Sequence, residues 1–169
     1  SLYTNTTGSS NSALGDHSLY SNTSGLSNTA VGDDAMYNNS TGDYNAALGR
    51  LSMNSNTTGN FNTTIGYSAG SLATTNANCT FLGYNADNSG GTSRSNSMAL
   101  GNGSLITADD QVRIGNSSVT SIGGYAGWTN VSDGRFKQNI QQDVKGLDFI
   151  LQLKPVTYSL NLPVLNQFL

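Results

Sequence analysis

The sequence predicts an all-β fold, a parallel β-roll or β-solenoid built from coils of 17 residues. Eight glycines from Gly8 to Gly66 are separated by alternate gaps of 7 and 10 residues, which add to a period of 17. Only 10% of the residues are charged, yet an aliphatic residue recurs with the same period. Two glycines per period would destabilise any helix by about 1 kcal/mol each, so the periodicity favours stacked short strands.

The repeat units begin at four equivalent asparagines, Asn5, Asn22, Asn39 and Asn56. Each unit reads Asn, two small residues, Gly, two variable residues, Asn, two small residues, an aliphatic residue and Gly, followed by a segment such as HSLY or DAMY. A fifth unit from Ala73 and a sixth from Gly90 follow the pattern less closely. The first four residues match residues 18–21, and we expect further units upstream.

Each coil is expected to hold two short strands, of the NSALG and HSLYS type, joined by glycine turns in which positive φ costs little. Stacking of the coils predicts two internal hydrophobic columns. The first comprises Leu14, Val31, Leu48, Ile65, Leu82 and Leu100, and the second comprises Leu2, Leu19, Met36 and Met53.

The asparagines are expected to stack as well. One ladder would comprise Asn11, Asn28, Asn45 and Asn62, and the other Asn5, Asn22, Asn39 and Asn56. Each amide could bond a turn and the amide of the next coil. The alternative interpretation is that asparagine serves only as a turn former, but strict periodicity at both positions favours internal ladders.

A roll with so few large apolar residues buries little surface, which favours several rolls packed side by side. Tyr20 and Tyr37 occupy equivalent positions in consecutive units. They could fill such a seam or lie at the surface as isolated aromatics.

The period fails near Ser104, and the sequence predicts three parts: a repeat shaft at 1–104, a β neck at 105–131 and a third part at 132–169. Alternating Val112, Ile114, Val119 and Ile122 indicate short strands in the neck. Apolar residues at helical spacing predict a short amphipathic helix over 144–153, which Pro155 ends before a strand at 156–160.

The third part resembles a known family. SDGRFKQNI at 132–140, GLDFILQLKPVTY at 146–158 and the preceding VRIG and VTSIG segments are similar to the opening of the endosialidase-type intramolecular chaperone domain, the S74 peptidase group. Residues 132–169 correspond to the N-terminal, incomplete part of such a domain. More loosely, the upstream repeats are similar to the head repeats of trimeric adhesins.

The resemblance implies a homotrimer whose C-terminal domain guides assembly of a β-rich fibre and then releases itself by cutting a Ser-Asp bond. Carried onto this sequence, it implies cleavage between Ser132 and Asp133, with Ser132 as nucleophile and Lys137 as its base. The alternative interpretation, Ser132 as a turn or cap residue and Lys137 as a solvated charge, stays open. The only enzymatic activity that we expect, if any, is this single self-cleavage. We expect no reaction with multiple turnovers.

Several classes of site are excluded or disfavoured. A net charge of −3 without a basic stripe argues against nucleic acid, and no apolar run reaches the roughly 20 residues of a membrane span. His17 is the only histidine, which argues against a catalytic triad and His-based metal sites. No cofactor or metal is expected, and the lone Cys79 is expected to be buried and inert.

The sequence therefore predicts a structural, receptor-binding segment of a homotrimeric fibre, located in a virion tail fibre or at a cell surface. Its partners would be two further copies and a host-surface or glycan receptor. One alternative is a bacterial extracellular adhesin or a fibre of an injection machine. Another is an ice- or glycan-binding solenoid that uses the Thr and Ser rows at 6–7, 23–24, 40–41 and 57–58.

Overall fold

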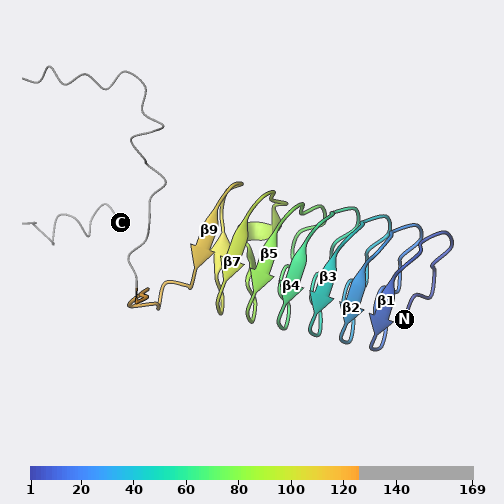
Figure 1. The fold of residues 1–169 in the computed structure, drawn as a ribbon, viewed down its shortest axis with the longest axis horizontal. Coiled ribbons are helices and arrows are strands. Elements are labelled where there is room, and N and C mark those ends of the chain that lie inside the picture. The colour runs from blue at the N-terminus through green and yellow to red at the C-terminus, as the bar shows by residue number, and fades with distance from the viewer. Residues whose placement is uncertain (126–169) are drawn as a thin grey trace, which may run out of the picture. The chain divides into compact units, whose positions relative to one another are not determined.

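The computed structural model describes residues 1–125 of the chain. The predicted helix at 144–153 and strand at 156–160 lie outside the described residues. The described part confirms the predicted fold class, since it is a parallel β-solenoid of about six turns (Figure 1). Residues 1–122 form one compact unit.

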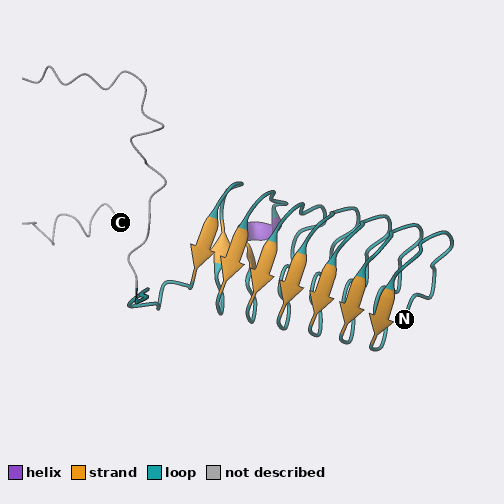
Figure 2. Ribbon diagram, in the orientation of Figure 1, coloured by secondary structure: helices purple, strands orange, loops and turns teal. Residues whose placement is uncertain are grey.

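One strand per coil builds the main sheet, whose strand order is β1-β2-β3-β4-β5-β7-β9, and β6 pairs with β8 in a second, two-stranded sheet (Figure 2). All pairings are parallel. The elements are β1 (Ser12–Leu14), β2 (Thr29–Val31), β3 (Ala46–Leu48), β4 (Thr63–Ile65), β5 (Thr80–Leu82), β6 (Asp87–Asn88), the 3-10 helix η1 (Ser89–Gly91), β7 (Met98–Leu100), β8 (Leu105–Ile106) and β9 (Val112–Ile114).

The sequence period sets the register of the sheet. From β1 to β5 each residue pairs with the residue 17 positions later, as Ser12 does with Thr29. From β5 to β7 the step is 18 residues, because Thr80 pairs with Met98, and from β7 to β9 it is 14, because Met98 pairs with Val112. The main sheet therefore continues into the segment for which the sequence predicts a separate neck.

The second strand expected in each coil is absent from the first coils, and the HSLYS prediction is wrong. Residues 16–21 form turns. His17 and Leu19 have φ values of 48° and 50°, in the left-handed region, which an extended strand does not contain. These turns still bond from coil to coil, since Leu19 N donates to Ala35 O at 3.0 Å.

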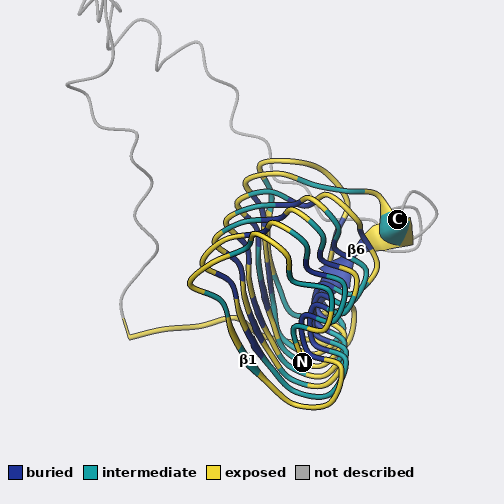
Figure 3. Ribbon diagram, turned by 90° about the vertical axis from the view of Figure 1, so that its right-hand side faces the viewer, coloured by how far each residue is buried: buried dark blue, intermediate teal, exposed yellow. Residues whose placement is uncertain are grey.

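The core consists of two rows that run along the stack (Figure 3). The middle residues of successive strands form one row, and the turns supply the other. Buried members of the first row are Ala30, Ala47, Thr64, Phe81 and Ala99, and those of the second are Leu19, Met36 and Met53, as predicted. Leu2, at the start of the second row, is partly buried against it.

The other predicted column is not internal. Leu14 is 69% exposed, Leu48 49% and Ile65 41%, and Val31, Leu82 and Leu100 occupy the same strand position in their coils. Side chains alternate between the two faces of a strand. In a strand of three residues, an inward middle residue therefore sends both neighbours outward.

The asparagines lie inside the coils and bond as ladders. In one ladder Asn45 Nδ2 donates to Asn28 Oδ1 at 3.1 Å and to Gly59 O at 2.8 Å. In the other, Asn39 Nδ2 donates to Asn22 Oδ1 at 2.9 Å, and Asn56 Nδ2 donates to Asn39 Oδ1 at 2.8 Å. Because each amide both donates and accepts, the ladders satisfy buried polar groups that water cannot reach.

Candidate subunit interface

The outward residues of the main sheet form one continuous surface, which we call the outer sheet face. It consists of the first and third residues of each strand, one row being Ser12, Thr29, Ala46, Thr63, Thr80, Met98 and Val112, and the other Leu14, Val31, Leu48, Ile65, Leu82, Leu100 and Ile114. None of these residues is charged. The face is therefore a strip of aliphatic, alanine and threonine side chains.

Exposure of this strip is high for apolar side chains. Besides the leucines and Ile65 above, Val112 is 67% exposed and Leu82 40%. A shallow, nearly apolar groove of about 260 Å³ lies over β2, β3 and β4, between Val31, Leu48 and Ile65. Large exposed apolar patches mark interaction sites.

Sheet geometry explains why the exposed residues form one strip. Neighbouring strands lie about 4.8 Å apart, so seven paired strands place one aliphatic side chain beside the next for about 30 Å. Parallel sheets are nearly always covered on both faces. The inner face is covered by the solenoid's own core, whereas the outer face has no cover from the described residues.

A cluster of charged side chains lies in the turns that follow β1, β2 and β3. Arg50 Nε donates to Asp33 Oδ2 at 3.2 Å, and this hydrogen bond is the main cause that raises the pKa of Arg50. His17 Nδ1 lies 3.4 Å from Asp16 Oδ2 and 3.6 Å from Asp34 Oδ1. These turns therefore border the uncharged outer sheet face with a polar rim, which is the usual anatomy of a protein interface.

Asp16, His17 and Asp33 also place possible metal-ligand atoms within 4.8 Å of one another. Asp16 and His17 are exposed and Asp33 is half-buried. Hydration competes with any ion at such a position, and Asp33 already holds Arg50.

The tyrosines stack along the coils. Tyr3, Tyr20 and Tyr37 lie parallel, with ring centroids 4.9 and 5.2 Å apart, and His17 meets Tyr20 edge-on at 5.3 Å. The ring faces of Tyr20 are thus covered by its own chain. A second roll packed against Tyr20 could therefore contact only the edge of its ring. That Tyr20 and Tyr37 fill a seam between rolls stays a prediction.

The predicted cleavage residues Ser132, Asp133 and Lys137 lie outside the described residues.

Sequence reasoning missed the outward direction of the Leu14 row, because leucine is the largest apolar residue in the NSALG segment. The alternation of side chains along a strand could have revealed it. Asn28 was expected to be internal, and Ala30, two residues later, must lie on the same face.

In the described part, no helix has the length and apolar character needed to cross a membrane. Neither the curated proteins nor the solved structures contain a match to the chain. The family model for the chaperone of endosialidase, peptidase S74, matches residues 132–166. The residues that follow the β-solenoid in the sequence are therefore similar to the chaperone of endosialidase family, as their motifs predicted.

Proposed function

We propose that this chain is a shaft segment of a homotrimeric fibre, assembled with the help of its C-terminal chaperone segment. The observation that carries the proposal is the uncharged aliphatic strip on the outer sheet face, in a chain whose residues 132–166 match the chaperone family. Covering one exposed Leu contributes about 1.5–3 kcal/mol at full burial. A row of half-exposed aliphatics thus gives a strong drive to associate.

The energetics of the single coil support the same proposal. The first inner row consists largely of alanine, with Phe81 as its one large residue, and the second row has a single large apolar residue per regular coil, such as Leu19, Met36 or Met53. A thin core of this kind gives little stabilisation per residue. Side-by-side packing of three copies through the outer sheet face would add a second, intermolecular core.

The fibre would act by reach and valency. A rigid shaft holds three copies of any binding site at fixed separations, so weak single contacts add up to avidity. Within this proposal the most specific role is a phage tail fibre located on the virion. A bacterial adhesin or an injection-machine fibre has the same architecture and differs in how its far end is anchored.

The first experiment is the native mass of the chain extended to its natural C-terminus, measured together with the denatured mass of the same sample. A native trimer is the expected result. A native monomer at micromolar concentration would overturn the proposal.

Self-cleavage is proposed with the trimer. Hydrolysis of the peptide bond between Ser132 and Asp133 consumes one water and leaves a carboxylate on Ser132 and an amine on Asp133. The denatured mass is expected to show this break in the wild type and an intact chain in Ser132→Ala. An intact wild-type chain in a native trimer would remove the cleavage and leave the fibre.

Ice binding through the Thr and Ser rows receives less support. Thr6 Oγ1 donates to Thr23 O at 2.9 Å, Thr23 Oγ1 to Ser40 O at 3.0 Å, and Ser40 Oγ to Thr57 O at 3.0 Å. One of the two hydroxyl rows is thus engaged within the stack. Absence of thermal hysteresis would remove this alternative.

A further inference from the structure

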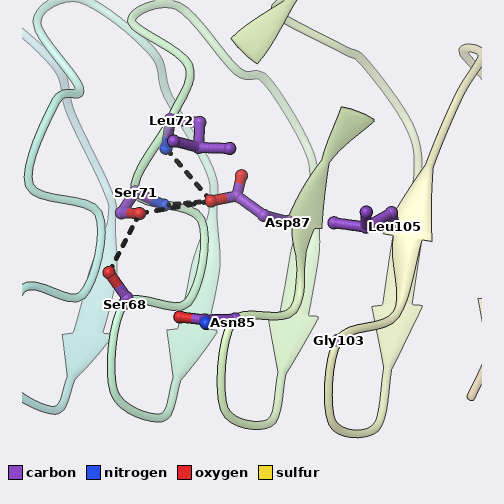
Figure 4. A pocket seen from close by; sticks show the side chains of 7 residues that line it. All are labelled: Ser68, Ser71, Leu72, Asn85, Asp87, Gly103 and Leu105. Atoms are coloured by element: carbon purple, nitrogen blue, oxygen red, sulfur yellow. Dashed lines mark hydrogen bonds between the residues drawn. The ribbon is translucent and has the colours of Figure 1, made fainter. Parts of the chain in front are cut away.

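A cavity of about 410 Å³ opens where the repeat becomes irregular. It is lined by Ser68, Ser71 and Leu72 from one coil, Asn85 and Asp87 from the next, and Leu105 from the third (Figure 4). Its volume lies within the range of about 300–1,000 Å³ that is typical of ligand pockets. None of these residues belongs to the outer sheet face, so association through that face leaves the cavity open.

Asp87 gives the cavity its chemical character. Its position in the coil is that of the core residues Leu19, Met36 and Met53, and only 3% of its surface is exposed. Burial raises the pKa of its carboxyl group above the ordinary value. An acid in place of an apolar core residue costs stability, which is common where a site serves binding.

A short chain of hydrogen bonds joins the polar groups of the cavity. Ser68 Oγ donates to Ser71 Oγ at 3.2 Å, and Ser71 Oγ donates to Asp87 Oδ2 at 3.3 Å. Oδ2 also accepts from the backbone N–H groups of Ser71 and Leu72, at 2.8 and 3.1 Å. Oδ1 accepts from Asn88 N at 2.7 Å, which leaves one of its lone pairs for an incoming donor.

The walls of the cavity are aliphatic. Leu72 and Leu105 are 54% and 40% exposed, and the Asn85 side chain adds an exposed amide. The lining contains no Lys or Arg. Acceptors and hydroxyls beside aliphatic walls suit a ligand that has many hydroxyl groups and an apolar ring face, and the carboxylate disfavours an anion.

The cavity depends on side chains that the first coils do not have. The position of Ser71 is held by Tyr20, Tyr37 and Asn54 in the preceding coils, and the two tyrosine rings stack on each other. The 18-residue step from β5 to β7 then brings Leu105 opposite Asp87, where β8 pairs with β6. One such cavity in each chain would give three cavities in a trimeric fibre.

We propose that this cavity binds one neutral pyranose unit of a surface glycan, with Asp87 Oδ1 and the Ser68 and Ser71 hydroxyls bonding sugar hydroxyls and the two leucines contacting the ring. The inference rests on the proposed function, because avidity over three copies makes a shallow single site effective. A single sugar unit would then bind weakly, and the trimer would bind immobilised glycan tightly.

The test uses the chain extended to its natural C-terminus, on an array of immobilised neutral and anionic glycans, with saturation-transfer NMR of the methyl glycosides that score. The wild type is expected to bind a neutral glycan. Leu105→Trp, which fills the cavity, is expected to lower binding at least 100-fold, and Ser68→Ala about 10-fold. Thr58→Ala, an exposed hydroxyl on another part of the coil, is the matched control and should bind as the wild type does.

Circular dichroism and the native mass of each variant separate this inference from the proposed function. A folded wild-type trimer that binds no neutral glycan, or a Leu105→Trp variant that binds fully, would overturn the sugar site and leave the fibre. A preference for anionic glycans would also overturn it. A monomer that binds neutral glycan in a Leu105-dependent way would keep the site and overturn the fibre.

Discussion

Phe81 and Gly70 compensate each other in side-chain volume, because one core row has a larger residue here than in earlier coils and the other row has a smaller one. Phe81 occupies the row that holds Ala30 and Ala47 in earlier coils, and Gly70 occupies the row of Met36 and Met53. A Cβ on Gly70 would lie 2.9 Å from Phe81 Cδ2. The ring thus fills the space that a methionine side chain fills elsewhere.

This compensation predicts strong coupling between the two positions. Phe81→Ala should lower the free energy of unfolding by about 3–5 kcal/mol, because it leaves a cavity. Gly70→Met alone should also destabilise, by overpacking. The double variant removes the contact with Phe81 and should recover part of the loss, although the new Cβ still meets Thr64 Cγ2 at 2.8 Å. Urea denaturation measures all three, and additive losses would contradict the compensation.

Gly49 illustrates why the second glycine of the repeat recurs. Its φ is 132°, and a Cβ there would lie 2.5 Å from Gly66 O. Gly49→Ala should therefore cost more than about 3 kcal/mol, through backbone separation of adjacent coils as well as strain.

The matched control is Gly90→Ala. Gly90 also has positive φ, at 71°, but nothing lies within 4 Å of its Cβ position. It should cost only the roughly 1–2 kcal/mol of a left-handed alanine. Equal losses of unfolding free energy in the two variants would show that conformation alone, and not coil spacing, selects the glycine.

Asp87 should make stability depend on pH. Burial raises the pKa of its carboxyl group in the folded state above the ordinary 3.8. Its contribution to stability is then fully present below that ordinary value and is lost as the pH rises through the folded pKa. The unfolding free energy of the wild type, measured relative to Asp87→Asn, should fall as the pH is raised from about 3 to about 7. A pH-independent difference would contradict the raised pKa.

At the scale of the strand, the sequence predicts the period better than the direction of the side chains. The NSALG segment contains two apolar residues in adjacent positions, and a shift by one residue exchanges the two faces. Alanine is the inward residue in β2 and β3, where it packs against Leu19, Met36 and Met53. The larger leucine then faces outward, where none of the residues 1–125 covers it.

The turns were harder to predict than the strands. Leu19, Met36 and Met53 have φ values of 50–55°, and bulky residues rarely adopt this conformation. The hydrophobicity of these residues suggested a strand. In the structure, their burial in the core outweighs the local preference of bulky residues for negative φ. The asparagine positions were easier, because an amide that recurs with the strand period needs a partner in the next coil.

The outer sheet face should be sensitive to a buried charge. In the extended chain, Leu48→Asp is expected to convert the proposed trimer to monomer, because an unpaired carboxylate would be desolvated at the proposed interface. Thr58→Asp, exposed elsewhere in the coil, should leave the trimer intact. Analytical ultracentrifugation measures both, and an unchanged trimer in Leu48→Asp would place the interface on another face.

For the whole molecule, regular coils follow directly from the sequence and the irregular ones do not. Four matching units predicted the solenoid, and SDGRFKQNI predicted the chaperone segment that the family model matches. The cavity beside Asp87 depends on residues 68, 87 and 105 meeting across three coils. The sequence shows the one inserted residue of the sixth unit, but only the structure shows that this 18-residue step brings the three side chains together.

The asparagine ladders give the solenoid a direction and make its length adjustable. Each Nδ2 in the ladder of Asn22, Asn39 and Asn56 donates toward the preceding coil, so every junction between regular coils is the same. A duplicate of residues 39–55 placed after residue 55 would meet its neighbours through these same contacts. It should lengthen the shaft by about 4.8 Å without loss of stability, which small-angle scattering and thermal unfolding can measure. The length of the solenoid would then change in steps of one coil. The number of repeat units in the gene would set the distance between the two ends of the proposed fibre.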